Sequence, residues 1–237
     1  MRHSLRLIST PFSVLALACA AGAAQAQECV GLPGGRGMLS LGLEGMDGAT
    51  GRGVSFAYQA PGASVQLHHR ALDAFAQEDE ISTSQAVAAV RLPRSRLPLC
   101  ITVGAEWTDY EYSDHAGSSY TDGVRTESYH VFGGYQRLRV PVGVSLGREF
   151  HVGRGASLVP YLQSTVFWER ERLAFRGGSA EERPGWGVGL NTGLAVAKDW
   201  FVVRANLAQT KTSFDRSPIL NRRNDVPVLS VHFGVRF

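Results

Sequence analysis

The chain has 237 residues, enough for one β domain of ordinary size. Its 24 lysine and arginine residues and 21 aspartate and glutamate residues give a formal net charge of only +3, which predicts no nucleic-acid partner. Mean hydropathy is near neutral at −0.08. No stretch beyond the N-terminal region approaches the roughly 18 consecutive apolar residues of a transmembrane helix.

The N-terminal residues have the three-part pattern of a secretory signal peptide. A basic start with Arg2 and Arg6 precedes an apolar run over residues 15–21, and small residues then end at Ala26. This pattern predicts a signal peptide over residues 1–26 and a periplasmic N-terminal segment over residues 27–36. A rival cleavage before Cys19 would give a lipoprotein, but position 16 is alanine where that motif usually has leucine.

The mature chain should consist of strands in which apolar and polar residues alternate. Because side chains alternate across a strand, this period of two gives each strand one apolar and one polar face. Ten segments have this pattern, at residues 39–44, 54–59, 65–71, 85–92, 101–108, 137–146, 158–175, 186–196, 201–208 and 226–237. The fourth is weak because alanine occupies both faces, so the sequence allows eight strands as well as ten, with ten favoured.

The last segment carries a further signal at the end of the chain. Val231, Phe233, Val235 and Phe237 share one face, and the chain ends on the aromatic ring of Phe237. With the signal peptide, this terminus resembles the closing strand of small bacterial outer-membrane β-barrel proteins. The resemblance implies one antiparallel transmembrane up-and-down barrel over residues 37–237, an all-β fold in the outer membrane. It also implies two partners, which are outer-membrane lipid and the barrel assembly machinery. The machinery would recognise Val231, Phe233, Val235 and Phe237 as an assembly signal. A soluble periplasmic sandwich is the alternative fold.

The lengths of the connections agree with a barrel whose two ends lie in the periplasm. Bacterial barrels have short periplasmic turns and longer external loops. The connections at 61–63, 93–98, 150–156 and 198–199 are short, and those at 73–83, 113–127, 175–184 and 213–225 are longer. Starting from a periplasmic N-terminus, the short ones all lie inside and the long ones outside. The tight turn at 47–51 is the exception.

The polar faces predict what lines the lumen. The candidates are Glu44, Arg70, Arg91, Glu106, Arg137, Arg139, Arg204, His232 and Arg236. They could line a small anion-preferring channel, or they could form a packed core of ion pairs and hydrogen bonds, which we favour for so narrow a barrel. Aromatic residues near strand ends predict membrane-interface belts, at Trp107, Tyr110, Tyr112, Trp168, Trp186, Trp200 and Phe237.

Two cysteines remain after cleavage of the signal peptide. Cys29 precedes the first strand and Cys100 begins the fifth, so both should lie at the periplasmic end. A pair in an oxidising compartment predicts a disulfide that tethers the N-terminal segment across the barrel floor. Neither cysteine has neighbours at metal-ligand spacing, so we predict no metal site and no cofactor here.

The external rim could hold catalytic groups, because some small outer-membrane barrels are enzymes. Asp109, Asp114, His115 and Asp122 could form a protease site, but no second Asp–His element faces them. Ser230 and His232 suggest a lipid A deacylase, yet their shared face puts them in the lumen. We therefore predict a non-enzymatic protein whose external loops contact an unidentified ligand, with residues 113–125 the best candidate surface. The alternatives are the channel and, less favoured, a rim-site enzyme that cleaves protein or modifies lipid A.

Overall fold

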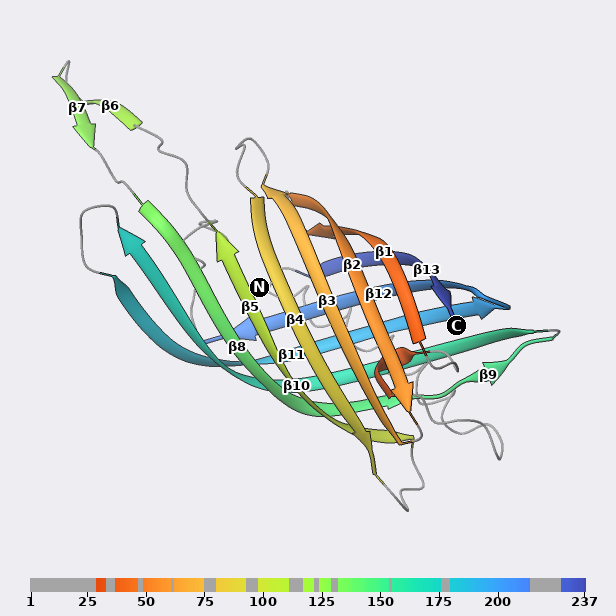
Figure 1. Cartoon of the computed structure of the whole chain (residues 1–237). Coiled ribbons are helices and arrows are strands. Elements are labelled where there is room, and N and C mark those ends of the chain that lie inside the picture. The colour runs from red at the N-terminus through yellow and green to blue at the C-terminus, as the bar shows by residue number, and fades with distance from the viewer. Residues whose placement is uncertain are drawn as a thin grey trace, which may run out of the picture.

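The protein is a closed antiparallel barrel of ten strands (Figure 1). The computed structural model describes residues 29–32, 37–46, 49–60, 62–74, 80–92, 98–110, 117–121, 124–128, 132–153, 155–175, 180–213 and 227–237. The strands of the ring are β1 (Gly37–Met46), β2 (Ala49–Ala60), β3 (Ala63–Ala74), β4 (Glu80–Arg91), β5 (Leu99–Tyr110), β8 (Phe132–Gly147), β10 (Ala156–Phe175), β11 (Glu181–Lys198), β12 (Phe201–Thr212) and β13 (Val228–Arg236).

Each strand of the ring pairs with the next one along the chain, and β13 returns to pair with β1. The closure is completed by two backbone hydrogen bonds between Gly37 and Phe237, of 2.9 and 3.0 Å. A closed ring leaves no unpaired sheet edge, which is the condition for a β-structure to cross a lipid bilayer. The prediction of ten strands rather than eight is thus confirmed. The weak fourth strand begins earlier than its pattern indicated, at Glu80, because it pairs in register with β3 and β5.

Three short strands lie outside the ring. The two-residue strand β9 (Phe150–His151) pairs with the start of β10. Strands β6 (Gly117–Thr121) and β7 (Val124–Ser128) pair only with each other, and Figure 1 shows them beyond the end of the barrel between β5 and β8. The barrel therefore has two different ends. The short-turn end holds the start of β1 and the end of β13, and the long-loop end holds the β6–β7 hairpin.

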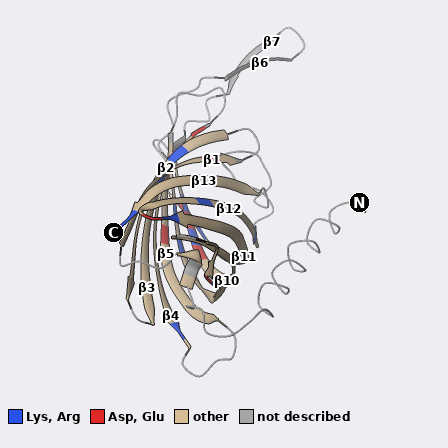
Figure 2. Ribbon diagram, turned by 90° about the vertical axis from the view of Figure 1, so that its right-hand side faces the viewer, with Lys and Arg blue, Asp and Glu red and all other residues tan. Residues whose placement is uncertain are grey.

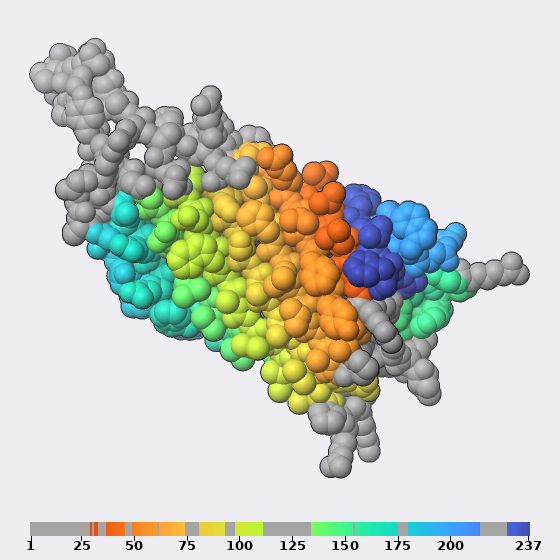
Figure 3. All heavy atoms as spheres, viewed as in Figure 1, coloured from red at the N-terminus to blue at the C-terminus, as the bar shows by residue number. Residues whose placement is uncertain are grey.

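Large apolar side chains cover the outer face of the described strands, one side of which is seen in Figure 3. Leu39, Leu41 and Leu43 of β1 point outward, and Leu41 is 67% exposed. Large aliphatic and aromatic side chains continue round the other strands in the same way. Trp107, Trp168 and Trp186 lie on this outer face toward the long-loop end, and Trp200 and Phe237 lie on it at the short-turn end. An apolar band between two aromatic girdles is the outer surface of a transmembrane barrel.

One residue of the expected aromatic belts faces the other way. Tyr110 lies inside the barrel with 2% of its surface exposed. Its parity along β5 is that of Cys100, Thr102 and Thr108, which are also buried. The expectation for Tyr110 was therefore wrong, since strand parity and not distance from the strand end decides which face a side chain occupies. Tyr112 lies outside the described residues.

The only described helix, η1 (Cys29–Gly31), is a single 3₁₀ turn inside the short-turn end. It packs against β3, β4, β5, β8, β10 and β11, which are consecutive strands of the ring. Gly31 has φ +68°, and a Cβ there would lie 2.0 Å from the ring of Tyr161, so only glycine fits this contact. Within the described part of the chain, no helix is long and apolar enough to cross a membrane.

Candidate functional site in the lumen

The polar parity of each strand lines the lumen, as its alternation requires. In Figure 2 the ribbon is mostly tan, and the charged residues form short blue and red segments. Among the predicted lumen residues, Glu44, Arg139, Arg204 and His232 are buried, and Arg70, Glu106 and Arg137 are half-buried. Arg91 and Arg236 lie at the short-turn end, where Arg91 is exposed and Arg236 donates a hydrogen bond to the backbone oxygen of Asp199.

One group of lumen ion pairs crosses β5, β8 and β10. Arg139 donates from Nε to Glu169 at 2.7 Å and lies 3.4 Å from Glu106. Arg137 donates to the same Glu106 oxygen at 3.1 Å. The guanidinium of Arg139 also lies 4.6 Å from the centre of the Phe167 ring. The register places Glu106 and Glu169 directly opposite Arg139 on its two neighbouring strands, so the pairing follows from the sheet itself.

A second group crosses β13, β1 and β3. Glu44 accepts a hydrogen bond from Nε2 of His68 at 2.8 Å, and its other oxygen lies 3.4 Å from Arg70. Nε2 of His232 lies 3.7 Å from the first Glu44 oxygen. The two imidazole rings are 5.3 Å apart in an edge-to-face arrangement. Two of the four residues in this second group are histidines, whereas the ion pairs of the first group contain only arginine and glutamate.

Arg204 belongs to a third group, built mainly of neutral partners. Its Nε donates to Asn206 at 3.2 Å, and Gln66 accepts from its guanidinium at 2.9 Å when the amide oxygen of Gln66 faces it. Asn206 in turn donates to Ser230 at 3.0 Å and accepts from Tyr161. Ser230 is therefore a member of a lumen hydrogen-bond network. Ser230 and His232 both face the lumen and not the lipid, so these two described residues do not form the lipid-facing pair that a lipid A deacylase would need.

Apolar clusters occupy the lumen at both ends of the polar section. At the long-loop end the buried cluster is Leu72, Ile81, Tyr110, Tyr135 and Leu173. At the short-turn end it is Leu32, Met38, Ala57, Ala197 and Val202. Leu32 follows η1, so the N-terminal segment contributes directly to the second cluster. Between the clusters lies a cavity of about 200 Å³, lined by all three polar groups.

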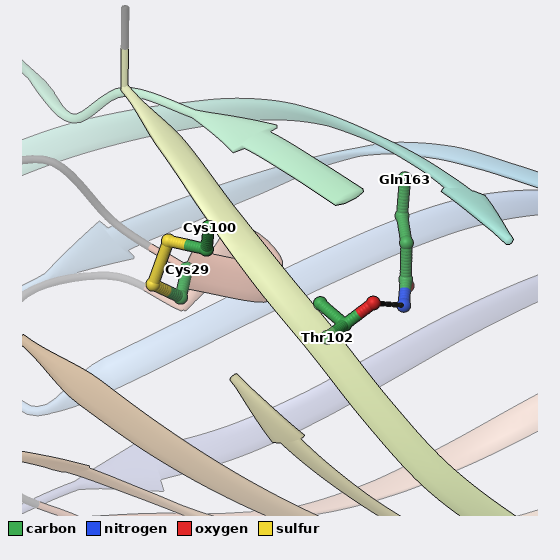
Figure 4. Close-up of a disulfide and its surroundings, with 4 residues drawn as sticks. All are labelled: Cys29, Cys100, Thr102 and Gln163. Carbon is green, nitrogen blue, oxygen red and sulfur yellow. Dashed lines mark hydrogen bonds between the residues drawn. A yellow bond between two sulfur atoms is a disulfide. The ribbon is translucent and has the colours of Figure 1, made fainter. Parts of the chain in front are cut away.

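The two cysteines meet inside the short-turn end (Figure 4). Cys29 and Cys100 are joined in the structure, with their Cα atoms 5.8 Å apart. Both are buried and form a small cluster with Ala89 of β4. Along the same face of β5, Thr102 accepts a hydrogen bond from Gln163 at 3.4 Å. The two cysteines thus meet where η1 packs against the barrel wall, within the lumen and not merely across its mouth.

Several lumen residues were not singled out by the sequence. Glu169 and Glu171 lie on β10, whose parity the sequence left hard to assign, and both are buried. Tyr135 donates to Glu171 at 2.7 Å. His68 lies on the polar face of β3 and is not among the predicted lumen residues, because nothing in the sequence shows that it meets Glu44. The signal that could have found Glu169 was its alignment with Arg139 across the β8–β10 pair.

The candidates for rim chemistry fall largely outside the described part of the chain. Asp114, His115 and Asp122 are not described. Asp109 lies at the end of β5 and is half-buried. The predicted signal peptide, residues 1–26, also lies outside the described residues. Val231, Phe233, Val235 and Phe237 of the predicted assembly signal stand on the outer parity of β13, with Phe237 72% exposed.

A closed ten-stranded barrel with a polar, largely filled lumen is the class of protein that these features define. No known family profile matches the chain, and no curated protein matches it in sequence. The solved structures it resembles are outer-membrane β-barrel proteins.

Three of these structures illustrate how similar they are to this chain in sequence and in fold. Neisserial surface protein A is 13% identical with a TM-score of 0.38, over 84% of this chain and 95% of that one. The attachment invasion locus protein Ail of Yersinia pestis is 13% identical with a TM-score of 0.33, over 85% and 99%. The outer membrane protease OmpT from Escherichia coli is 9% identical with a TM-score of 0.39, over 85% and 91%.

Proposed function

We propose that this protein is a non-enzymatic integral barrel of the bacterial outer membrane that holds its long loops at the cell surface. It is exported by residues 1–26 and inserted by the barrel assembly machinery, and its outer face contacts membrane lipid. The observation that carries the proposal is the filled lumen, in which η1 and two apolar clusters enclose a paired polar section. A barrel filled in this way serves as an anchor, and its loops are then the part free to meet a partner.

The alternative is a small anion-preferring channel, and the cavity of about 200 Å³ is the observation that favours it. Against it stand the ion pairs of Arg70, Arg137 and Arg139, since an arginine already paired with glutamate offers little field to a passing anion.

Single-channel recording of the refolded mature protein in a planar bilayer separates the two functions. We expect no conductance steps from protein shown to be inserted. Steady, salt-dependent steps that change in size or selectivity in Arg137→Ala or Arg139→Ala would show that the protein is a channel and would contradict the proposed anchor function. Arg170→Ala is the matched control, because Arg170 lies on the outer face with its side chain 51% exposed.

The exposure of the long-loop end at the cell surface is tested by epitope tags. One tag is inserted between Thr121 and Val124, where β6 and β7 are joined, and the matched control tag is inserted at Gly62 in the short turn between β2 and β3. We expect antibody to label the first tag on intact cells and the second only after the outer membrane is permeabilised. The reverse pattern would contradict the proposed orientation.

We further propose that Cys29 and Cys100 form a disulfide in the periplasm that holds η1 in the lumen. The link closes a loop of 71 residues, for which the chain-entropy estimate is a stabilisation of about 4 kcal/mol. Cys29→Ser with Cys100→Ser should lower the free energy of unfolding by about that amount. Thiol labelling without prior reduction should leave the unfolded wild-type protein unmodified, and labelling of both cysteines there would disprove the pairing.

A further inference from the structure

In the second lumen group, the imidazoles of His68 and His232 both face the carboxylate of Glu44, so three possible metal-ligand side chains converge there. Nε2 of His68 and Nε2 of His232 both point toward the same oxygen, Oε1 of Glu44, at 2.8 and 3.7 Å. One nitrogen or oxygen from each of the three side chains lies within 4.8 Å of the other two. Glu44 and His232 are buried, and the side chain of His68 is 12% exposed.

The Nε2 atom of His68 has a hydrogen-bond partner in Glu44, whereas the imidazole of His232 has no such partner. The distance of 3.7 Å is too long for a hydrogen bond, and Nδ1 of His232 has no hydrogen-bond partner. A buried imidazole nitrogen that makes no hydrogen bond loses the solvation that water gave it, which is unfavourable. A ligand shared with Glu44 and His68 would satisfy Nε2 of His232.

The backbone around these side chains makes room for them. Gly42 of β1 lies directly opposite His232 of β13 on one side and Gly53 of β2 on the other. A Cβ at Gly42 would lie 2.3 Å from Nδ1 of His232, and a Cβ at Gly53 would lie 3.0 Å from both Glu44 and His68. Two paired glycines on the lumen face thus form a cradle into which the three side chains converge from β1, β3 and β13.

From this geometry we propose that Glu44, His68 and His232 bind a divalent transition-metal ion, with Zn²⁺ as the reference ion. Two imidazole nitrogens and one carboxylate oxygen suit zinc and its neighbours in the first transition row, whereas calcium and magnesium require oxygen ligands. Bonds of about 2.0–2.1 Å in a tetrahedral site place neighbouring ligand atoms roughly 3.3 Å apart. The two histidine–glutamate separations, 2.8 and 3.7 Å, lie on either side of that value, and all three ligand atoms lie within 4.8 Å of one another.

The surroundings of the three ligands complete the site. Arg70 lies 3.4 Å from the other oxygen of Glu44, Oε2, and so orients the carboxylate with Oε1 toward the two histidines. All three ligand residues line the cavity of about 200 Å³. The fourth position of a tetrahedral ion would therefore be filled from the cavity, by water or by a small ligand that enters the lumen.

The test measures Zn²⁺ binding by the refolded full barrel after treatment with a chelator. We expect one Zn²⁺ per chain by elemental analysis, and Glu44→Gln, His68→Asn and His232→Gln should each weaken binding more than about 100-fold in calorimetry, beyond the loss typical of an outer-shell change. His69→Ala is the matched control: this neighbouring histidine points outward and bonds Ser84 at 3.0 Å, and its loss should leave binding unchanged. Heat-modifiable migration in gels confirms that each variant is folded.

Cobalt gives a second readout that depends on coordination and not only on affinity. Co²⁺ bound to the wild-type barrel should show the intense d–d absorption of a four-coordinate ion, and Zn²⁺ but not Mg²⁺ should abolish it. Gly42→Ala, which displaces His232 without removing a ligand, should lose this spectrum while remaining folded. Absence of zinc from the folded wild-type barrel, or equal binding by His69→Ala and His68→Asn, would overturn the proposal.

Discussion

Replacing Glu169 by glutamine should destabilise the folded barrel by about 3 kcal/mol. Glu169 is fully buried, and its carboxylate accepts the 2.7 Å hydrogen bond from Arg139. The substitution removes the charge but keeps the shape of the side chain. Arg139 can still donate to an amide oxygen at position 169, but the only carboxylate left beside its charge is that of Glu106 at 3.4 Å, together with the face of the Phe167 ring.

The size of the effect follows from what remains buried. Removing one partner of a buried ion pair typically costs about 3–5 kcal/mol, because the other charge is left without its partner. The remaining contacts of Arg139 place Glu169→Gln at the lower end of this range. A loss of about 3 kcal/mol corresponds to a change of more than 100-fold in the unfolding equilibrium constant.

Glu182→Gln is the matched control for this substitution. Glu182 pairs with Arg170, but these side chains are 44% and 51% exposed, and such exposed pairs contribute little to stability because solvent screens them. Denaturant unfolding of both variants in lipid vesicles, followed by tryptophan fluorescence and gel migration, gives the comparison. If Glu169→Gln unfolds within about 1 kcal/mol of the wild type, or no more easily than Glu182→Gln, the lumen ion pairs do not stabilise the barrel as argued.

Two further changes test the outer face and the long-loop end of the lumen. Leu41→Arg places a charge in the apolar band and should cost about 2–4 kcal/mol in vesicle unfolding, whereas Thr50→Arg, outward-facing near the strand end, should cost at most about 1 kcal/mol. Equal costs would contradict the assigned membrane position. Tyr135→Phe removes the 2.7 Å donor to buried Glu171 and should cost about 1–3 kcal/mol, while Tyr58→Phe on the exposed outer face should be nearly neutral. A neutral Tyr135→Phe would show that Glu171 is satisfied in another way.

Much of the fold could be predicted from the sequence because strand parity is a local property. The alternation around Leu41 and Phe233 assigned the outer face, and the same alternation placed Glu44 and His232 inside. Tyr110 was misassigned because it was judged by its nearness to a strand end. Glu169 was missed because the long segment over residues 158–175 gave no clear parity before its partner strands were known.

By itself, the sequence determined that this chain forms strands with an apolar and a polar face, with ten strands favoured over eight, since alternation along the backbone needs no knowledge of distant residues. Only the tertiary structure decided which lumen groups meet. Glu44 reaches His232 because closure of the ring sets β13 beside β1, and Arg139 reaches Glu169 through the register of β8 and β10. The entry of η1 into the lumen is likewise a long-range contact, made where Gly31 meets the ring of Tyr161. Such contacts depend on strand register and ring closure, which arise only when the whole barrel has formed.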